Sequence, residues 1–230
     1  MSTTRAAIDL SAVTKTFGSV TAVDRLDLTI PRGALYGFIG PNGAGKTTAI
    51  RMIMSILLPD SGELKVLGHP SALEAKDRIG YLPEERGLYR KMKVAAYLTF
   101  IARLKGVPER SLRERVHSAI ERIGLAGVEA KRCEELSKGM SQKIQILAAT
   151  IHEPDLLILD EPFSGLDPVS TRLLKDLILA EHRRGATVLF STPLSPMLSI
   201  AVSMRSRSPR SGTPFRRAMN MRYGATFILR

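Results

Sequence analysis

A glycine-rich segment near residue 40 constrains the fold of this chain more than any other feature. It reads Gly40-Pro-Asn-Gly-Ala-Gly-Lys-Thr47: a glycine, four residues, a second glycine, a lysine and a threonine. An apolar run at 34–39 precedes it, and a helical pattern from about 45 to 57 follows it. In this strand–loop–helix context the pattern predicts a phosphate-binding loop, and the alternative is a glycine-rich turn that arose by chance.

The residue types of this loop suit a nucleoside triphosphate and its magnesium ion. Glycines let backbone N–H groups approach the phosphates, and the N-terminus of the following helix adds unpaired N–H groups. Lys46 is predicted to reach the β- and γ-phosphates, and the Thr47 hydroxyl to bind Mg²⁺. The candidate nucleotide-binding residues of the loop are Gly40, Pro41, Asn42, Gly43, Ala44, Gly45, Lys46, Thr47 and Thr48.

A second candidate motif follows a short apolar run at 156–159. Asp160 and Glu161 come directly after this run, at the carboxyl end of an expected buried strand, where α/β sheets place their ligands. Asp160 is predicted to hold Mg²⁺, and Glu161 to accept a proton from an attacking water. The alternative is a surface acidic pair that caps the next turn.

Strand-like and helix-like segments alternate along the chain, which predicts an α/β fold with a mostly parallel sheet flanked by helices. Apolar runs and alternating patterns predict strands at 8–13, 26–30, 34–39, 78–82, 156–159 and 186–191. Helical patterns occur at 45–57, 94–105, 109–123, 141–151 and 168–184. The run of helices between 94 and 151 predicts a helical lobe inserted into the sheet.

Composition excludes several classes of protein. No apolar stretch approaches the roughly 20 residues of a membrane-spanning helix, and the single cysteine excludes an internal disulfide. The net charge of +12 resembles a nucleic-acid signal, but residues 193–230 hold seven arginines, no lysine and no acid. The remaining residues therefore carry 12 − 7 = +5, and we expect no nucleic-acid partner.

The ordered set of motifs resembles the ATP-binding subunit of an ABC transporter over residues 6–192. Leu136-Ser-Lys-Gly-Met140 stands at the place of that family's signature, with Ser137, Lys138, Gly139 and Met140 as candidate contacts to ATP. Asp167 ends a segment like the family's D-loop, and Phe17 stands where an aromatic residue stacks on adenine. Taken alone, Phe17 is more typical of a core residue than of a stacking platform, and Ser137 is more typical of a helix cap than of a phosphate contact.

The resemblance implies a P-loop NTPase of the ABC-cassette type, with an antiparallel β portion near the N-terminus. It implies catalytic roles for Glu161 and Lys46, with ATP and Mg²⁺ as cofactors. Two cassettes, in a homodimer or a mixed pair, would enclose ATP between the phosphate loop of one and the signature of the other. Their partner would be a membrane permease, which places the chain in the cytoplasm against the inner face of the membrane.

Four positions depart from the family pattern. Lys138 and Met140 replace a glycine and a glutamine of the signature, and Glu84 stands where a glutamine usually contacts the metal, which makes it a further candidate Mg²⁺ ligand. Pro193 stands where a histidine should contact the γ-phosphate. The four histidines lie elsewhere, and we expect them on the surface. The segment 81–89 is similar to the branch of sodium- and drug-efflux exporters.

The sequence predicts two regions: a nucleotide-binding domain at 1–192, with a helical lobe at about 90–150, and an atypical basic tail at 193–230. Two origins for the tail stay open, a native disordered extension and a segment read out of frame. Because the family places further strands after the histidine, we expect their loss to expose one edge of the sheet.

Three functions stay open at this point. The leading one is an ATP-hydrolysing subunit that energises an exporter through a separate permease. The second is a cassette that binds nucleotide but hydrolyses it poorly, for which Pro193 is the reason. The third is an ATPase of the same fold that acts on nucleic acid or ribosomes, supported only by the charge of the tail.

Overall fold

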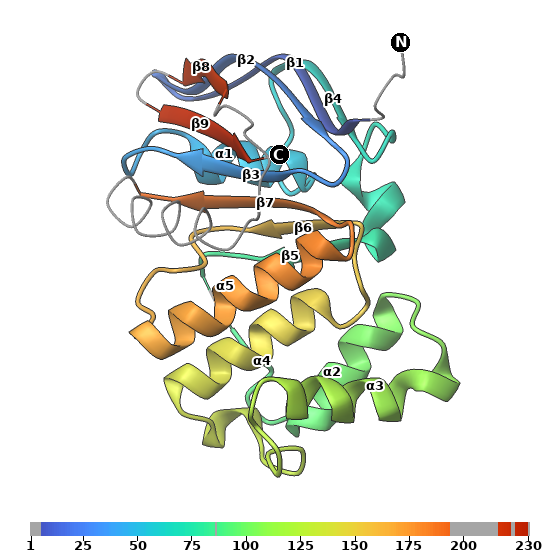
Figure 1. Ribbon diagram of the computed structural model, residues 1–230. Helices are drawn as coiled ribbons and strands as arrows, with labels where there is room; N and C mark the ends of the chain where they lie inside the picture. The colour runs from blue at the N-terminus through green and yellow to red at the C-terminus, as the bar shows by residue number, and fades with distance from the viewer. Residues whose placement is uncertain (1–5, 86, 194–215, 222–223, 230) are drawn as a thin grey trace, which may run out of the picture.

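The computed structural model describes residues 6–85, 87–193, 216–221 and 224–229 (Figure 1). Its strands are β1 (Ala6–Phe17), β2 (Val20–Pro31), β3 (Leu35–Ile39), β4 (Ser61–Val66), β5 (Ile79–Leu82), β6 (Leu156–Leu159), β7 (Thr187–Thr192), β8 (Arg216–Met221) and β9 (Gly224–Leu229). Its helices are α1 (Lys46–Ile53), α2 (Val94–Leu104), α3 (Glu109–Arg122), α4 (Lys138–Thr150) and α5 (Pro168–Arg183), with 3-10 turns at Ala72–Arg78 and Cys133–Glu135.

The strands form two sheets. One is antiparallel and has the order β2-β1-β4, and the other has the order β5-β6-β7-β3-β9-β8. In the larger sheet β5, β6, β7 and β3 run parallel to one another. The α/β class, the mostly parallel sheet and the antiparallel portion near the N-terminus are therefore confirmed.

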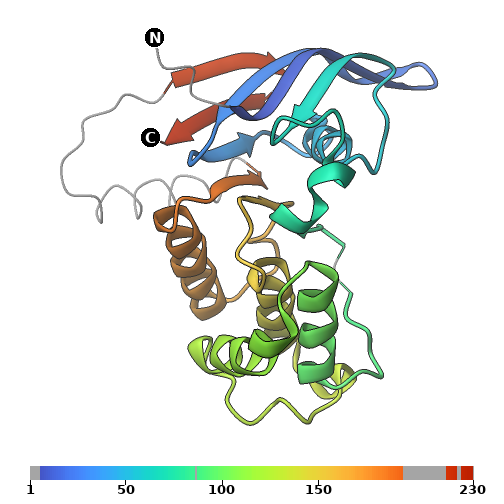
Figure 2. The same ribbon diagram turned by 90° about the vertical axis from the view of Figure 1, so that its right-hand side faces the viewer.

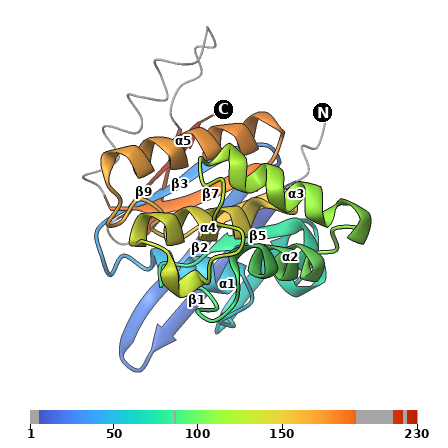
Figure 3. The same cartoon turned by 90° about the horizontal axis from the view of Figure 1, so that it is seen from below.

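The larger sheet is the middle of three layers, and its side chains alternate between two apolar clusters. Leu157 and Leu159 face the cluster built with α2 to α5, whereas Leu156 and Ile158 face the cluster built with α1 and the antiparallel sheet. Such alternation follows from the two-residue period of a strand, and a sheet buried on both faces reads as a continuous apolar run. Figures 2 and 3 show helices α2 to α5 gathered on one face of this sheet.

Up to residue 192, strands β1 and β2 are longer than the sequence predicts, one helix is shorter, and one strand is new. The helix after the phosphate loop ends at Ile53 rather than near residue 57, because Ser55 takes a left-handed conformation with φ 55° and turns the chain. Strand β4 was not expected at all. Only its last residue, Val66, is buried, so its polar sequence carries no strand signal, and its pairing with β1 makes it a strand.

The described parts of the tail form a hairpin beside β3. Strand β9 pairs antiparallel with β3 from Leu35↔Leu229 to Ile39↔Ala225, and β8 pairs with β9. The edge of the sheet that we expected to be exposed is thus covered by tail residues. Residues 194–215 lie outside the described part of the chain, and both proposed origins of the tail stay predictions. None of the described helices is long and apolar enough to cross a membrane.

Candidate functional site

The glycine-rich loop joins the end of β3 to the start of α1, and two of its glycines are required by their conformation. Gly43 and Gly45 have φ values of 80° and 83°, in the left-handed region that disfavours residues with a side chain. At Gly45 an added Cβ would also lie 2.3 Å from the carbonyl oxygen of Ala22. The loop geometry therefore agrees with a backbone that wraps closely around phosphates.

Lys46 lies inside the loop and is 4% exposed. Its Nζ donates to the carbonyl oxygens of Gly40 at 2.8 Å and Pro41 at 3.0 Å, and it lies 3.5 Å from Oε1 of Glu161. A buried ammonium group needs such partners because burial without them is costly. The structure thus brings the two predicted catalytic residues, Lys46 and Glu161, together.

Asp160 follows β6 and is 1% exposed. Its Oδ1 accepts hydrogen bonds from Ser191 Oγ at 2.6 Å and Thr47 Oγ1 at 3.3 Å. Its Oδ2 is buried and has no hydrogen-bond partner among the described residues. A carboxylate oxygen without a partner beside a threonine hydroxyl fits the hard oxygen ligands that Mg²⁺ prefers. Thr47 and Asp160, both predicted as metal ligands, therefore lie together.

Glu161 has an unusual backbone, with φ 46°. A residue other than glycine in the left-handed region costs roughly 1–3 kcal/mol and persists only where its surroundings hold it. Its N–H donates to Ser191 Oγ at 2.7 Å, which is one such constraint. Sequence reasoning missed Ser191, and the only available signal was a polar residue near the end of the apolar strand β7.

Phe17 ends β1 and is 50% exposed, so it is not a core residue. The ammonium group of Lys15 lies 5.7 Å from the centre of its ring. A half-exposed aromatic ring can stack on a nucleotide base. Its role as the adenine platform stays a prediction.

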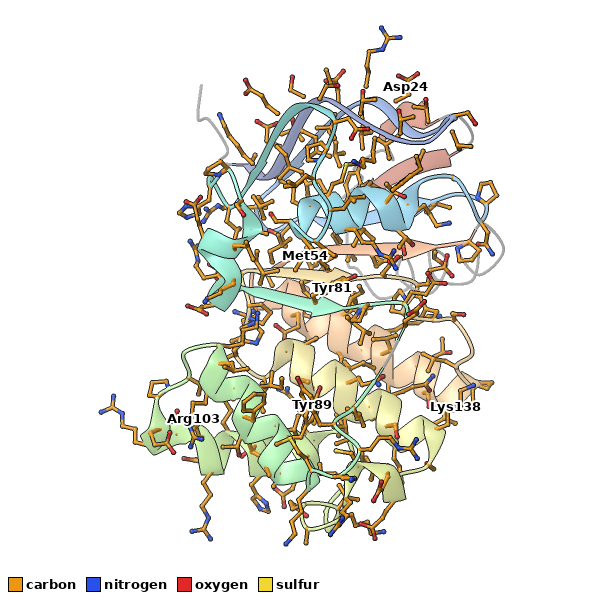
Figure 4. The ribbon with its side chains drawn as sticks, turned by 180° about the vertical axis from the view of Figure 1, so that it is seen from behind. Asp24, Met54, Tyr81, Tyr89, Arg103 and Lys138 are labelled. Atoms are coloured by element: carbon orange, nitrogen blue, oxygen red, sulfur yellow. The ribbon has the colours of Figure 1, made fainter. Side chains whose placement is uncertain are left out.

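The signature residues lie at the start of α4, away from the phosphate loop, and Figure 4 shows Lys138 there at the edge of the molecule. Ser137 caps this helix, with its hydroxyl 3.3 Å from the N–H of Met140. Asp167 caps α5 by accepting from Val169 and Ser170, and the Ser170 hydrogen bonds lower the pKa of its carboxyl. In the described residues no hydrogen bond or ion pair joins the signature to the loop at 40–48.

The structure also shows where two of the residues that depart from the family pattern, Glu84 and Pro193, lie. Glu84 is exposed, and no hydrogen bond or ion pair among the described residues links it to Thr47 or Asp160. Pro193 follows β7, and the buried hydroxyl of the preceding Thr192 has no partner in the described part of the chain. The expectation of surface histidines was wrong for His152, whose Nε2 lies 3.2 Å from the Ile79 carbonyl and whose burial lowers its pKa to about 4.

Comparison with known proteins gives a consistent result. A protein-family model described as ABC transporter matches residues 23–164. An uncharacterized ABC transporter ATP-binding protein of Bacillus subtilis, YhaQ, is 49% identical over 185 residues, which cover 80% of this chain and 62% of that protein. The daunorubicin/doxorubicin resistance ATP-binding protein DrrA of Streptomyces peucetius is 37% identical, covering 81% of this chain and 57% of DrrA.

Solved structures share the fold. An ATP-binding subunit of an ABC transporter has a TM-score of 0.75 at 27% identity, covering 83% of this chain and 81% of that one. The cbiO1 protein from Clostridium perfringens, described as part of the ABC transporter complex cbiONQ, has a TM-score of 0.71 at 26% identity, covering 82% and 79%.

The chain is shorter than several of these relatives, since it spans 62% of YhaQ and 57% of DrrA. The family match covers more than half of the chain and includes the phosphate loop, the signature and the two acidic residues after β6. The family match and these relatives agree, and the chain belongs to the ABC transporter family of ATP-binding proteins.

Proposed function

We propose that this chain binds MgATP and hydrolyses it to energise export through a separate membrane permease. The observation that carries the proposal is the buried contact of Lys46 with Glu161 beside Asp160 and Thr47. These side chains come from α1 and from the turn after β6, which the two parallel strands β3 and β6 bring to the same edge of the sheet.

Each residue of this cluster has a proposed task. The backbone of the loop and Lys46 would bind the β- and γ-phosphates, with Lys46 exchanging its carbonyl partners for phosphate oxygens. Thr47 and Asp160 would hold Mg²⁺, which neutralises charge on the transferring phosphoryl group. Glu161 would accept the proton of the attacking water, and Phe17 would stack on the adenine.

A second copy or a related cassette would complete the site. Ser137 and Gly139 stand at the N-terminus of α4, where unpaired N–H groups favour an anion. Because they make no contact with the loop of their own chain, we propose that they bind the γ-phosphate held by a partner in a head-to-tail dimer. Lys138 would add a positive charge to the same surface, and Asp167 would fix the neighbouring start of α5.

The permease partner and the location rest on the relatives. DrrA is named as a resistance ATP-binding protein, and cbiO1 is described as part of a transporter complex. We propose by analogy that this chain acts on the cytoplasmic face of a membrane, attached through its permease. The same relatives favour transport over an action on nucleic acid or ribosomes.

Pro193 supports a second candidate, a cassette that binds nucleotide but turns it over slowly. Proline has neither a side-chain hydrogen bond nor an N–H to offer a γ-phosphate. The difference between the two candidates lies in kcat and not in the affinity for ATP, since the loop at 40–48 is the same in both.

The test compares ATP turnover by the purified chain with turnover by Glu161→Gln, and measures MgATP affinity for both. Turnover that falls roughly 100-fold or more in Glu161→Gln, with affinity retained, supports the active enzyme. Bound MgATP without turnover in either protein supports the slow cassette. Equal turnover by both proteins would contradict the role of Glu161.

A further inference from the structure

A serine that belongs to no recognised motif connects the two acidic residues of the site. Ser191 lies near the end of β7 and is 0% exposed. Its hydroxyl donates to Asp160 Oδ1 at 2.6 Å and accepts from the N–H of Glu161 at 2.7 Å. One side chain therefore contacts the proposed metal ligand and the backbone of the proposed base at the same time.

We propose that Ser191 is a positioning residue for ATP hydrolysis, which sets the orientation of the Asp160 carboxylate toward the magnesium ion and holds the backbone of Glu161. The inference rests on the proposed function. Hydrogen bonds from a second residue to a metal-binding side chain commonly fix that side chain and tune the affinity for the metal.

The contacts of Asp160 show why its orientation depends on Ser191. Oδ1 accepts from two hydroxyls, Ser191 at 2.6 Å and Thr47 at 3.3 Å, so the shorter bond is the one from Ser191. Oδ2 is buried without a partner in the described part of the chain, and it is the oxygen left for a cation or its water. If the Thr47 hydroxyl leaves Asp160 to bind Mg²⁺, the Ser191 hydroxyl still donates to Oδ1 and keeps it in place.

The contacts of Glu161 give Ser191 a second effect. Glu161 is held at both ends, with its N–H on Ser191 and its carboxylate 3.5 Å from Lys46. Its φ of 46° is a strained value, so the residue depends on the groups around it to keep this conformation. When phosphate draws Lys46 away, the bond to Ser191 remains to hold the backbone of the base.

The strand pairing explains how a residue so far along the chain reaches the site. In the parallel pair β6–β7, Leu159 is opposite Phe190. Asp160, which follows the end of β6, and Ser191 on β7 come next, and the Ser191 hydroxyl reaches both the Asp160 carboxylate and the N–H of Glu161.

Thr187 offers a matched control at the other end of the same strand. It is 1% exposed, and its hydroxyl also accepts a hydrogen bond from a backbone N–H, that of Gly33, at 2.9 Å. Ser191→Ala and Thr187→Val thus each remove a buried hydroxyl from β7 and leave one N–H without its acceptor. Only the first removes a contact to the acidic pair.

The experiment measures two quantities for the wild type, Ser191→Ala and Thr187→Val. The first is the affinity for a fluorescent ATP analogue with Mg²⁺ and with EDTA, whose ratio reports the contribution of the metal. The second is the rate of ATP hydrolysis as a function of ATP concentration, which gives kcat and KM separately. In Ser191→Ala we expect the Mg²⁺ contribution and kcat each to fall about 10-fold or more, with affinity in EDTA unchanged. In Thr187→Val we expect neither to change by more than about 2-fold.

Other outcomes separate this inference from the proposed function. If a folded Ser191→Ala keeps the wild-type Mg²⁺ contribution and kcat, the inference is overturned. If Thr187→Val loses as much of both as Ser191→Ala does, Ser191 only stabilises the fold and the inference is also overturned. If Ser191→Ala does not fold, Ser191→Cys, which has a weaker donor of similar size, carries the same test. A wild type without turnover would contradict hydrolysis, and the Mg²⁺ contribution to binding would still decide the role of Ser191.

Discussion

The molecule carries two clusters of candidate functional residues, one buried and the other exposed. Lys46, Asp160 and Glu161 are 4%, 1% and 9% exposed, and their hydrogen-bond and ion-pair partners come from within the chain. Ser137 and Lys138, at the start of α4, are exposed, and the Ser137 hydroxyl bonds only within its own helix turn. The first cluster is called the loop cluster below, and the second, with Gly139 and Met140, the signature cluster.

The difference follows from the cost of burial. Polar groups taken out of water need partners nearby, so most of the loop cluster's contacts are made within its own chain. Exposed polar groups are satisfied by water and place no such demand on the fold. The signature cluster can therefore be left incomplete until another surface covers it, which is what a shared ATP site between two cassettes would require.

Lys46→Ala is expected to have the largest effect and to break only the loop cluster. The substitution removes the ammonium group that would bind the β- and γ-phosphates through charge-assisted hydrogen bonds. We expect ATP affinity to fall about 100-fold or more and turnover to disappear, as measured by nucleotide titration and phosphate release. Lys65→Ala, at an exposed position on β4, is the control and should retain both.

Ser137→Ala is expected to affect the signature cluster alone. MgATP affinity of the single chain should stay within about 2-fold, because Ser137 does not contact the loop, while ATP-dependent dimerisation and turnover fall about 10-fold. Loss of the cap costs roughly 0.5–2 kcal/mol of stability, and Ser71→Ala removes another serine that caps a helical turn. Dimerisation is measured by light scattering. If Ser137→Ala and Ser71→Ala dimerise equally weakly, the loss in Ser137→Ala comes from lower stability and not from a lost contact to ATP.

Removal of the hairpin tests whether the tail supports only the loop cluster. Ending the chain at residue 215 removes β8 and β9 and leaves the backbone groups of β3 unpaired on one side. We expect a lower Tm, by several degrees, and faster amide exchange in β3 with unchanged exchange in α4. Exchange in β3 that is equal with and without the hairpin would contradict this pairing in solution.

Acid sensitivity at His152, a residue of neither cluster that follows the end of α4, is the smallest expected effect. Burial first, and then the charge of Lys105, lower the pKa of His152 to about 4 in the folded chain, against 6.5 for the free side chain. Between these values the unfolded chain binds a proton that the folded chain does not, so stability falls as the pH drops from 6.5 to 4.

His152→Gln keeps a donor for the Ile79 carbonyl and should flatten this part of the pH profile. Thermal unfolding at several pH values between 7 and 4 measures this dependence, and we expect the Tm of the wild type to fall more than the Tm of the variant. Burial also lowers the pKa of His182, so a smaller slope of the same sign should remain. Identical slopes in both proteins would contradict the lowered pKa of His152.

Much of the fold could be predicted because local patterns carried it. The strand Leu156–Leu159 and the start of α5 at Pro168 lie where the sequence places them, since a buried run and a proline in the first turn are local signals. Strand β4 and the early end of α1 could not be predicted. Pairing with β1 makes the first a strand, and the left-handed Ser55 ends the second.

The sequence by itself was enough to propose which side chains carry the chemistry, because Lys46, Thr47, Asp160 and Glu161 belong to patterns that are short along the chain. Only the tertiary structure decided what holds them in place. Ser191 reaches Asp160 across 31 positions of sequence because β6 and β7 are parallel neighbours, and no local pattern records such a contact. The exposure of the signature was decided in the same way, by the surface on which α4 begins.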